Sequence, residues 1–285
     1  MIIVTDMSGR KKPEGQPAAP DPGFQKGTAT QLDNYEGDPN FVLSLARGLR
    51  VIESFDGRKD GITVADAARH TGLSRAAVRR LLITLEALGY AESRGRLYRL
   101  RSRVLGLGFS FISSTSLITA AQPLLDQIAE TIHESSSMSI LDGEDIVYVA
   151  RSSVHRLMAV ELSIGSRLPA YCTSMGRVLL AGFPDQELDC YLERIRPKAH
   201  TPKTVTSKSQ LRKIILRVRH AGYALVDEEI EPGLRAMAVP VCNRQGHTVA
   251  AINIGAPALR FRRQHFDEYL GLLREAARTL SLAAC

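Results

Sequence analysis

Between residues 41 and 103, apolar side chains recur at the three- to four-residue spacing of amphipathic helices. Leu45, Leu49 and Ile52 predict a first helix that begins near Ser44 and buries these three side chains. A third helix is predicted from a longer apolar stripe, which comprises Val78, Leu81, Leu82, Leu85 and Leu88. The pattern therefore predicts a compact helical unit with one shared core.

The segment between these two helices has the signals of a short helix followed by a tight turn. Thr63 and Asp66 have the spacing of a capping box, so we expect a second helix to begin there. Gly72 can adopt the left-handed conformation that ends a helix, and Ser74 can cap the helix that follows. Together these residues predict a helix-turn-helix.

Basic side chains are concentrated in the same unit. From Arg69 to Arg103 there are nine arginines and two acidic residues. Two short β runs around Arg94 and Gly95 predict a basic hairpin, or wing, beside the third helix. In winged helix-turn-helix proteins the start of the third helix enters the major groove of DNA, where arginine can bind guanine through two hydrogen bonds. A solvated arginine face would explain the helix alone, but not the ordered set of helix, turn and hairpin.

We therefore expect this unit to bind DNA, with Arg75 and Arg79 as the base contacts. The full set of expected DNA contacts is Thr63, Ser74, Arg75, Ala76, Arg79 and Arg80 on the helices, and Arg94 and Arg96 on the wing.

The rest of the chain mixes strand and helix patterns. A mostly apolar stretch over residues 104–133 predicts two helices that break near Pro123, link the two parts of the chain and dimerise. Asp142 and Gly143 predict a β-hairpin turn. Further strands are expected within residues 157–165 and 236–256, and helices within residues 173–183, 186–195, 209–223 and 266–283. The predicted fold class is α+β, with a curved antiparallel sheet in the C-terminal part.

Composition and charge indicate the kind of partner that the protein binds and the cellular compartment in which it works. The 285 residues have a formal net charge of +7, and its concentration in one unit favours a polyanionic partner. The four cysteines lie far apart without a C-x-x-C pair, so we expect no zinc ribbon or disulfide scaffold. The histidines are scattered as well, and we expect neither a metal site nor a cofactor. No apolar run reaches the ~18 residues that span a bilayer, and the first residues lack the order of a signal peptide. We expect a cytoplasmic protein without a membrane partner.

Several separated stretches resemble the IclR family of bacterial transcriptional regulators. In chain order they are LARGLRVIESF, VADAARHTGLSRAAVRRLLITLEALGY, IGSRLPAYCTSMGRVLLA, DEEIEPGLRAMAVPV and AAINIGAP. Within the family, the chain is most similar to the branch that controls aromatic-acid catabolism through the β-ketoadipate route. The resemblance implies a homodimeric or homotetrameric repressor or activator that binds a double-stranded DNA operator. It also implies an acid effector, which we expect to be aromatic or dicarboxylic.

Five prolines and little apolar material predict a disordered tail over residues 1–40, which the resemblance does not cover. For the rest of the chain, the resemblance implies a winged helix-turn-helix domain over 41–103, a linker helix over 104–118, and a GAF-like effector-binding domain over 119–285.

In this family the effector pocket is formed by the segment after the RLP motif, the acidic segment before GLR, and the strand AAINIG. The effector contacts that the resemblance implies are Ser174, Met175, Val226, Asp227, Ala236, Asn253 and Gly255. The residues themselves are compatible with a carboxylate at the start of a helix capped by Thr173 or Ser174, although an ordinary capped helix has the same pattern. Arg167 and Arg235 are either carboxylate forks or surface arginines.

Two other functions fit parts of the sequence. Cys172 could be the nucleophile of a small-molecule hydrolase or transferase, although no histidine lies in a recognisable catalytic motif. The basic hairpin alone would suffice for a ligand-independent architectural or RNA-binding protein. A DNA-binding regulator accounts for the helix-turn-helix signals and the family stretches together, and it is the function that we expect.

Overall fold

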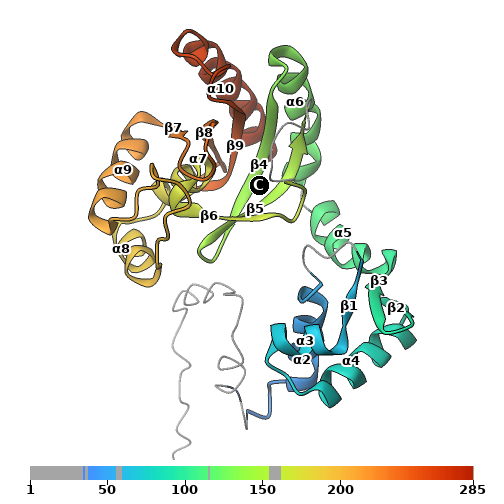
Figure 1. The fold of residues 1–285 in the computed structure, drawn as a ribbon. Coiled ribbons are helices and arrows are strands. Elements are labelled where there is room, and N and C mark those ends of the chain that lie inside the picture. The colour runs from blue at the N-terminus through green and yellow to red at the C-terminus, as the bar shows by residue number, and fades with distance from the viewer. Residues whose placement is uncertain (1–34, 36–37, 56–59, 115, 154–161, 285) are drawn as a thin grey trace, which may run out of the picture.

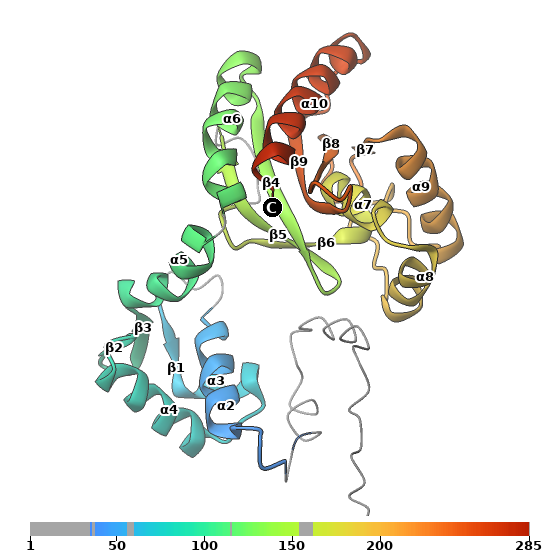
Figure 2. The same ribbon diagram turned by 180° about the vertical axis from the view of Figure 1, so that it is seen from behind.

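The computed structural model describes residues 35, 38–55, 60–114, 116–153 and 162–284. Most of the predicted tail, and most of the strand predicted within 157–165, lie outside these residues. Figures 1 and 2 show a smaller N-terminal unit and a larger C-terminal unit, with helix α5 between them. This arrangement separates the predicted DNA-binding elements from the predicted effector site.

The N-terminal unit packs three helices against a small antiparallel sheet. The helices are α2 (Leu43–Glu53), α3 (Val64–Thr71) and α4 (Arg75–Ala87), and the strands are β1 (Ile62–Thr63), β2 (Ala91–Arg94) and β3 (Leu97–Leu100), in the order β1-β3-β2. Val51, Ile62, Val78 and Leu82 are fully buried and form the centre of the core. β2 and β3 are the predicted wing, and the two-residue strand β1 was not predicted.

The buried face of α2 differs from the predicted one. Leu45 and Leu49 are 62% and 45% exposed, whereas Val51 is buried. Gly48 lies against Leu81 of α4, because a Cβ built on this glycine would be 3.9 Å from the leucine side chain. The small residue lets the two helices meet on that side, and the neighbouring face of α2 that carries Leu45 and Leu49 is left in solvent. The prediction that Leu45 and Leu49 lie in the core is wrong.

Two helix ends also differ from the prediction. α2 begins at Leu43, and no side chain caps it, so Ser44 is not its N-cap. Leu88 was expected to face the core but is 51% exposed. The reason is that α4 ends at Ala87, after which the chain turns away at Gly89 with a φ of 79°.

Three helical segments connect the two units. They are η1 (Ser102–Val104), α5 (Leu105–Ser114) and α6 (Ser116–Ile132). The predicted break near Pro123 is wrong, because Pro123 lies inside α6. A proline in a helix costs about 3 kcal/mol, but α6 buries Leu117, Ala121 and Leu125 along one face. This packing holds the helix together, and Leu117, which falls in the predicted linker segment, belongs to the core of the C-terminal unit.

The C-terminal unit is built on a six-stranded antiparallel sheet. Its strands are β4 (Ser135–Asp142), β5 (Asp145–Ser152), β6 (Arg167–Pro169), β7 (Ala224–Asp227), β8 (Leu234–Cys242) and β9 (Thr248–Pro257), in the order β6-β5-β4-β9-β8-β7. β4 and β5 form the predicted hairpin, with Gly143 at a φ of 65° in the turn. The sheet is curved in Figure 1, and the α+β fold class is confirmed.

Helices cover both faces of this sheet (Figures 1 and 2). α6 and α10 (Phe266–Ala283) pack on one face, and α7 (Ser174–Ala181), α8 (Asp185–Arg194) and α9 (Lys208–Ala221) lie on the other. Side chains alternate between the faces of a strand, so Met237 and Val239 point to α6 and α10 while Ala238 points to the α7 side. The sheet thus has small residues under α7, and this leaves room for a pocket.

Candidate functional site

Local capping fixes α3 and α4 as a helix-turn-helix. The Thr63 hydroxyl accepts a hydrogen bond from the Asp66 N–H (3.1 Å), and the Thr63 N–H donates to Asp66 Oδ2 (3.3 Å). Gly72 ends α3 with a φ of 71°, and Ser74 Oγ accepts from the Ala77 N–H (3.2 Å) at the start of α4. The predicted capping box, glycine turn and serine cap are therefore present.

The start of α4 presents an exposed basic face. Five of the predicted DNA contacts meet there in solvent, namely Ser74, Arg75, Ala76, Arg79 and Arg80. Among the described residues, none of the three arginines has an acidic partner. Arg75 and Arg79 lie one turn apart, so their side chains leave the same side of the helix. Thr63 is half-buried, and its hydroxyl is occupied by Asp66 at the base of α3.

The wing is held against α4 by contacts between distant residues. Glu86 Oε1 accepts hydrogen bonds from the Ser93 N–H (2.9 Å) and hydroxyl (2.6 Å). Arg103 donates to the Leu88 carbonyl (2.7 Å), and its guanidinium lies 5.1 Å from the centre of the Tyr90 ring. No sequence signal pointed to Glu86, since the contact joins two separate elements.

The two predicted wing arginines differ in their surroundings. Arg94 Nε lies 3.4 Å from the Glu92 carboxylate on the same strand. Arg96 follows Gly95 in the tip of the hairpin, is exposed, and has no acidic partner in the described part of the chain. Arg96 is therefore the freer of the two to contact a phosphate.

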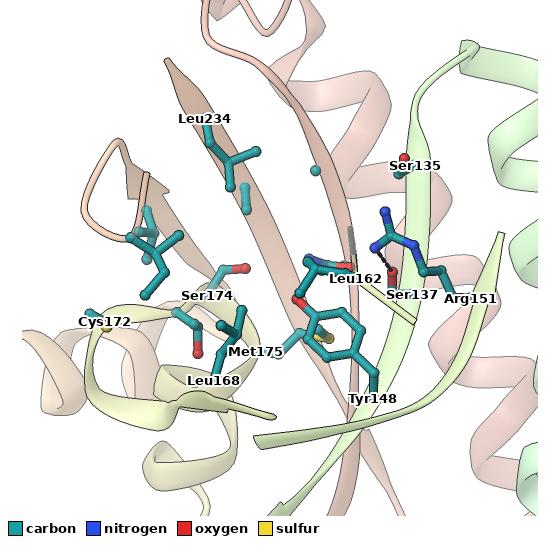
Figure 3. Close-up of a pocket in the computed structure, with 16 residues that line it drawn as sticks. Ser135, Ser137, Tyr148, Arg151, Leu162, Leu168, Cys172, Ser174, Met175 and Leu234 are labelled. Carbon is teal, nitrogen blue, oxygen red and sulfur yellow. Dashed lines mark hydrogen bonds between the residues drawn. The ribbon is translucent and has the colours of Figure 1, made fainter. Parts of the chain in front are cut away.

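A cavity of about 50 Å³ lies between the sheet and the start of α7 (Figure 3). A single water molecule needs about 10–15 Å³, so the space suits a small organic molecule. Six of the seven residues implied by the family resemblance line it, namely Ser174, Met175, Val226, Ala236, Asn253 and Gly255. Residues from four separate stretches of the chain are thus brought together.

Asp227 is the seventh of these residues, and it does not line the cavity. Its carboxylate accepts hydrogen bonds from Arg235 (2.7 Å) and Lys203 (3.2 Å). Partial burial favours the neutral acid, but these two cations outweigh it and hold the pKa of Asp227 below its ordinary value. The side chain thus acts in an ion-pair network beside the pocket.

Thr173, and not Ser174, caps α7. Its hydroxyl oxygen accepts from the Gly176 N–H (3.2 Å). The absence of a side chain on Gly176 is essential here, because a Cβ would lie 2.2 Å from the Ala170 carbonyl oxygen. This close contact seats the start of α7 on the segment before it and places Ser174 and Met175 at the pocket.

The sequence analysis missed the polar side chains that β4 and β5 contribute to the pocket, and three of them lie together. Arg151 at the end of β5 is half-buried and donates to Ser137 Oγ of β4 (3.3 Å), and Tyr148 of β5 lies beside them (Figure 3). Burial lowers the pKa of Arg151 and raises the pKa of Tyr148 to about 12, so at neutral pH the phenol remains protonated. A charged residue at the end of the apolar run IVYVA was the only signal in the sequence.

The two arginines considered as carboxylate forks are engaged elsewhere. Arg167 donates to Asp142 Oδ2 (2.5 Å) and Asp145 Oδ2 (3.3 Å), and Arg235 pairs with Asp227. Neither of them lines the cavity. The structure therefore gives both a role in internal ion pairs.

A buried ion pair joins α7 to the segment after β7, two parts of the cavity wall. Arg177 on α7 donates to both carboxylate oxygens of Glu229 (2.6 and 2.7 Å), and the Glu229 carboxylate also accepts from the Val205 N–H (3.1 Å). Glu229 directly follows Glu228, which has a strained φ of 57°. The pair fixes the segment after β7 to α7, so it connects two walls of the cavity.

Cys172 does not have the surroundings of an activated nucleophile. Its thiol is buried, and burial raises its pKa to about 12, whereas nucleophilic cysteines have a lowered pKa. In the described part of the chain, no cluster of histidine, cysteine and acidic residues could hold a metal ion. Nor is any helix of that part long and apolar enough to cross a membrane.

Two family models match the chain. The model described as "Bacterial transcriptional regulator IclR C-terminal" matches residues 109–282, and the one described as "IclR helix-turn-helix domain" matches residues 44–95. The first range holds the sheet and the cavity, and the second holds α4 and its capped turn.

Similar proteins agree with both matches. The Pca regulon regulatory protein of Pseudomonas putida is 44% identical over 280 residues, which cover 98% of this chain and 96% of that protein. The p-hydroxybenzoate hydroxylase transcriptional activator of Acinetobacter baylyi is 36% identical over 248 residues, 85% of this chain and 91% of that protein. The crystal structure of an IclR homolog from Microbacterium hydrocarbonoxydans, complexed with 4-hydroxybenzoate, has a TM-score of 0.74 at 25% identity, covering 84% of this chain and 98% of that chain.

Proposed function

We propose that this chain, which belongs to the IclR family of bacterial transcriptional regulators, contacts its operator through α4 and the wing and is controlled by an aromatic acid bound in the cavity. The family membership supplies the DNA-binding regulatory function. The contact residues, the effector and the assembly are the proposed part. The observation that carries the proposal is the exposed, unpaired pair Arg75 and Arg79 on a capped helix.

The proposed DNA contacts follow from the geometry of α4. The helix has 13 residues, which corresponds to about 20 Å, and an α-helix fits the major groove of B-DNA. Arg75 and Arg79 can each bind a guanine with two hydrogen bonds, and the small Ala76 between them permits close approach. We assign the exposed Arg80 on α4 and Arg96 at the tip of the wing to phosphates, which hold the register of the protein on the duplex.

An aromatic acid is the effector that the pocket and the relatives support best. The A. baylyi relative is named as an activator for p-hydroxybenzoate hydroxylase, and the M. hydrocarbonoxydans homolog holds 4-hydroxybenzoate. Here Leu168, Met175 and Tyr148 offer apolar and aromatic surface to a ring. We prefer an aromatic acid to a dicarboxylic one because Arg151 is the single cationic residue among the described lining residues.

We further propose that the protein acts as a homodimer, with pairing of dimers as the route to a tetramer. Large apolar side chains are exposed on α2 and at α5, namely Leu45, Leu49, Leu105, Leu107 and Phe111. Exposed apolar patches of this kind mark association surfaces. Two winged units related by a twofold axis would fit half-sites about one helical turn, or a multiple of it, apart. A bound effector would change the position of the two winged units relative to each other, and α5 would transmit this change.

The proposal is tested by mobility-shift titration of a promoter fragment with the Arg75→Ala plus Arg79→Ala variant. Each guanine contact contributes about 1–3 kcal/mol of discrimination, so the variant should lose at least tenfold in affinity for the operator over unrelated DNA. The matched control is Arg217→Ala plus Arg278→Ala, which removes the same charge from exposed positions on α9 and α10. Equal affinities for the two variants would remove Arg75 and Arg79 from the recognition role.

A further inference from the structure

Arg151 differs from the other buried or half-buried arginines in the described part of the C-terminal unit because it has no acidic partner there. The other four lie within salt-bridge distance of a carboxylate, namely Arg167, Arg177, Arg212 and Arg235. The Arg151 guanidinium donates instead to a neutral group, the Ser137 hydroxyl. A half-buried cation without an anion is an unusual feature, because charge taken from water is normally paired.

The cavity around Arg151 also lacks negative charge. None of the described lining residues is aspartate or glutamate. Asp227 and Glu229 lie near the cavity wall, but Arg235 and Arg177 bind their carboxylates. An anionic ligand would therefore meet one guanidinium and no competing carboxylate, a setting in which charge-assisted hydrogen bonds are strong.

The side-chain carbonyl of Asn253 in the pocket lacks a hydrogen-bond donor among the described residues. Asn253 is 7% exposed, and no described residue donates a hydrogen bond to its buried Oδ1. Buried polar atoms normally have a partner. Because Oδ1 is a carbonyl oxygen, the partner that it requires is a donor, such as a hydroxyl group.

The two groups belong to one row across the sheet. Arg151 on β5 is paired with Ser137 on β4, and Ser137 is paired with Asn253 on β9. Adjacent strands lie about 4.8 Å apart, so two strand spacings separate the backbone of Arg151 from that of Asn253. Figure 3 shows Arg151 and Ser137 on the β4 and β5 side of the pocket, and Ser174 and Cys172 on the α7 side.

We infer that Arg151 binds the carboxylate of the effector and that Asn253 Oδ1 accepts a hydrogen bond from a hydroxyl of the same molecule. The pocket is thereby selective for hydroxy-substituted aromatic acids, whose acid group points to β4 and β5 and not to the start of α7. This inference rests on the proposed function and adds the class of ligand and its orientation. Neither residue role follows from the charge pattern of the sequence.

Calorimetric titration of the full-length protein with three probes tests both roles. The probes are 3,4-dihydroxybenzoate, its uncharged amide 3,4-dihydroxybenzamide, and benzoate, which lacks the hydroxyls at both distal ring positions. The wild type should bind the dihydroxy acid at least tenfold more tightly than either of the others. Arg151→Met should abolish the preference for acid over amide and keep the preference for hydroxyls. Asn253→Ala should do the reverse.

Controls separate a lost contact from a lost fold. Arg167→Met removes a cation beside the lining residue Leu168 but outside the cavity, and it should keep both preferences. Arg151→Lys retains the charge and should keep part of the acid preference if Arg151→Met proves too unstable to titrate. Thermal melts of each variant establish that the protein is folded.

The outcomes distinguish this inference from the proposed function. If Arg151→Met keeps the full acid preference, or Asn253→Ala keeps the full hydroxyl preference, the corresponding role is wrong. Operator affinity that still responds to the dihydroxy acid in such a variant would leave the proposed function standing. If no probe binds the wild type or changes its operator affinity, the aromatic-acid effector and this inference both fail, while the loss of DNA binding in the Arg75 and Arg79 variant is unaffected.

Discussion

In the N-terminal unit Arg75, Arg79 and Arg96 extend into solvent without an acidic partner among the described residues. In the C-terminal unit Arg177 is 3% exposed and makes two hydrogen bonds to Glu229. The same residue type is thus available to an external polyanion on α4 and at the tip of the wing, and neutralised within the protein beside the cavity. Net charge records only the sum of the two populations, so the function depends on which arginines lack partners.

This contrast also identifies Arg151 as an exception. The other buried or half-buried arginines in the described part of the C-terminal unit lie near a carboxylate, whereas Arg151 donates to the Ser137 hydroxyl. An unpaired arginine on the surface fits a large polyanion such as DNA, whereas one that lines a cavity fits a small anion. The comparison therefore assigns the two proposed ligands to the two units by the surroundings of each arginine.

The largest expected effect is on the stability of the C-terminal unit after loss of the Arg177 and Glu229 pair. Removing one partner of a buried pair leaves an uncompensated charge and costs about 3–5 kcal/mol. Arg177→Met should lower the free energy of unfolding by this amount, measured by urea denaturation. Arg278→Ala, on the exposed face of α10, should stay within about 0.5 kcal/mol of the wild type.

A double variant sharpens this first prediction. Arg177→Met combined with Glu229→Leu removes both charges, so a substantial part of the stability should return. If the double variant is as unstable as the sum of the two single variants, the loss comes from packing and not from the unpaired charge.

A smaller effect is expected at the turn that aims α4. Ser74→Ala removes the side-chain acceptor for the Ala77 N–H, and loss of such a cap costs about 1 kcal/mol. The melting temperature of the N-terminal unit should fall, and operator binding should weaken with it. Ser102→Ala, at an exposed position outside α4, is the matched control. An unchanged melting temperature for Ser74→Ala would show that the cap is not needed to hold the helix-turn-helix.

The elements that sequence analysis predicted well are those fixed by neighbouring residues. The Thr63 capping box, the turn at Gly72 and the Gly143 hairpin each depend on contacts within four residues. The strands β1, β6 and β7 were missed because they have two to four residues, and the partners of β1 and β6 are also remote in the chain. A short run has too few positions to show an alternating pattern.

The errors at α2 and α6 have a different origin. Leu45 and Leu49 fit a helical stripe, but whether a stripe is buried depends on what packs against it. Pro123 disfavours a helix locally, and the burial of one face of α6 overrides this preference. Six of the effector positions came from resemblance and lie together, whereas Arg151 and the unpartnered Asn253 carbonyl could be recognised only once the strands were in register.

A finer test of the exposed arginines uses salt. If Arg96 contacts a phosphate, binding releases a counterion there, and Arg96→Ala should reduce the slope of log affinity against log salt by about 1. The loss should be equal for operator and unrelated DNA, because a phosphate contact does not distinguish sequence. Arg217→Ala, exposed on α9, should leave the slope unchanged. A loss confined to the operator would instead assign Arg96 to base recognition.

The smallest expected effect is at the partly exposed pair of Asp227 and Arg235. Hydrogen bonds from Arg235 and Lys203 outweigh the burial of Asp227 and hold its pKa below the ordinary value of 3.8. A lowered pKa means that this stabilisation is complete above pH 3.8 and is lost as the pH falls through the pKa of the folded state. Because the aspartate side chain is 41% exposed, solvent screening limits the contribution to about 1 kcal/mol or less.

Asp227→Asn should therefore lower the free energy of unfolding slightly at pH 7. On acidification, the free energy of unfolding of this variant should decline less than that of the wild type. Glu275→Gln on α10 is the control for a lost surface charge. If the free energies of unfolding of Asp227→Asn and of the wild type decline in parallel on acidification, the ion pairs beside the cavity do not stabilise the folded unit. The paired arginines of that unit would then differ from those of α4 only in their surroundings, and not in their contribution to stability.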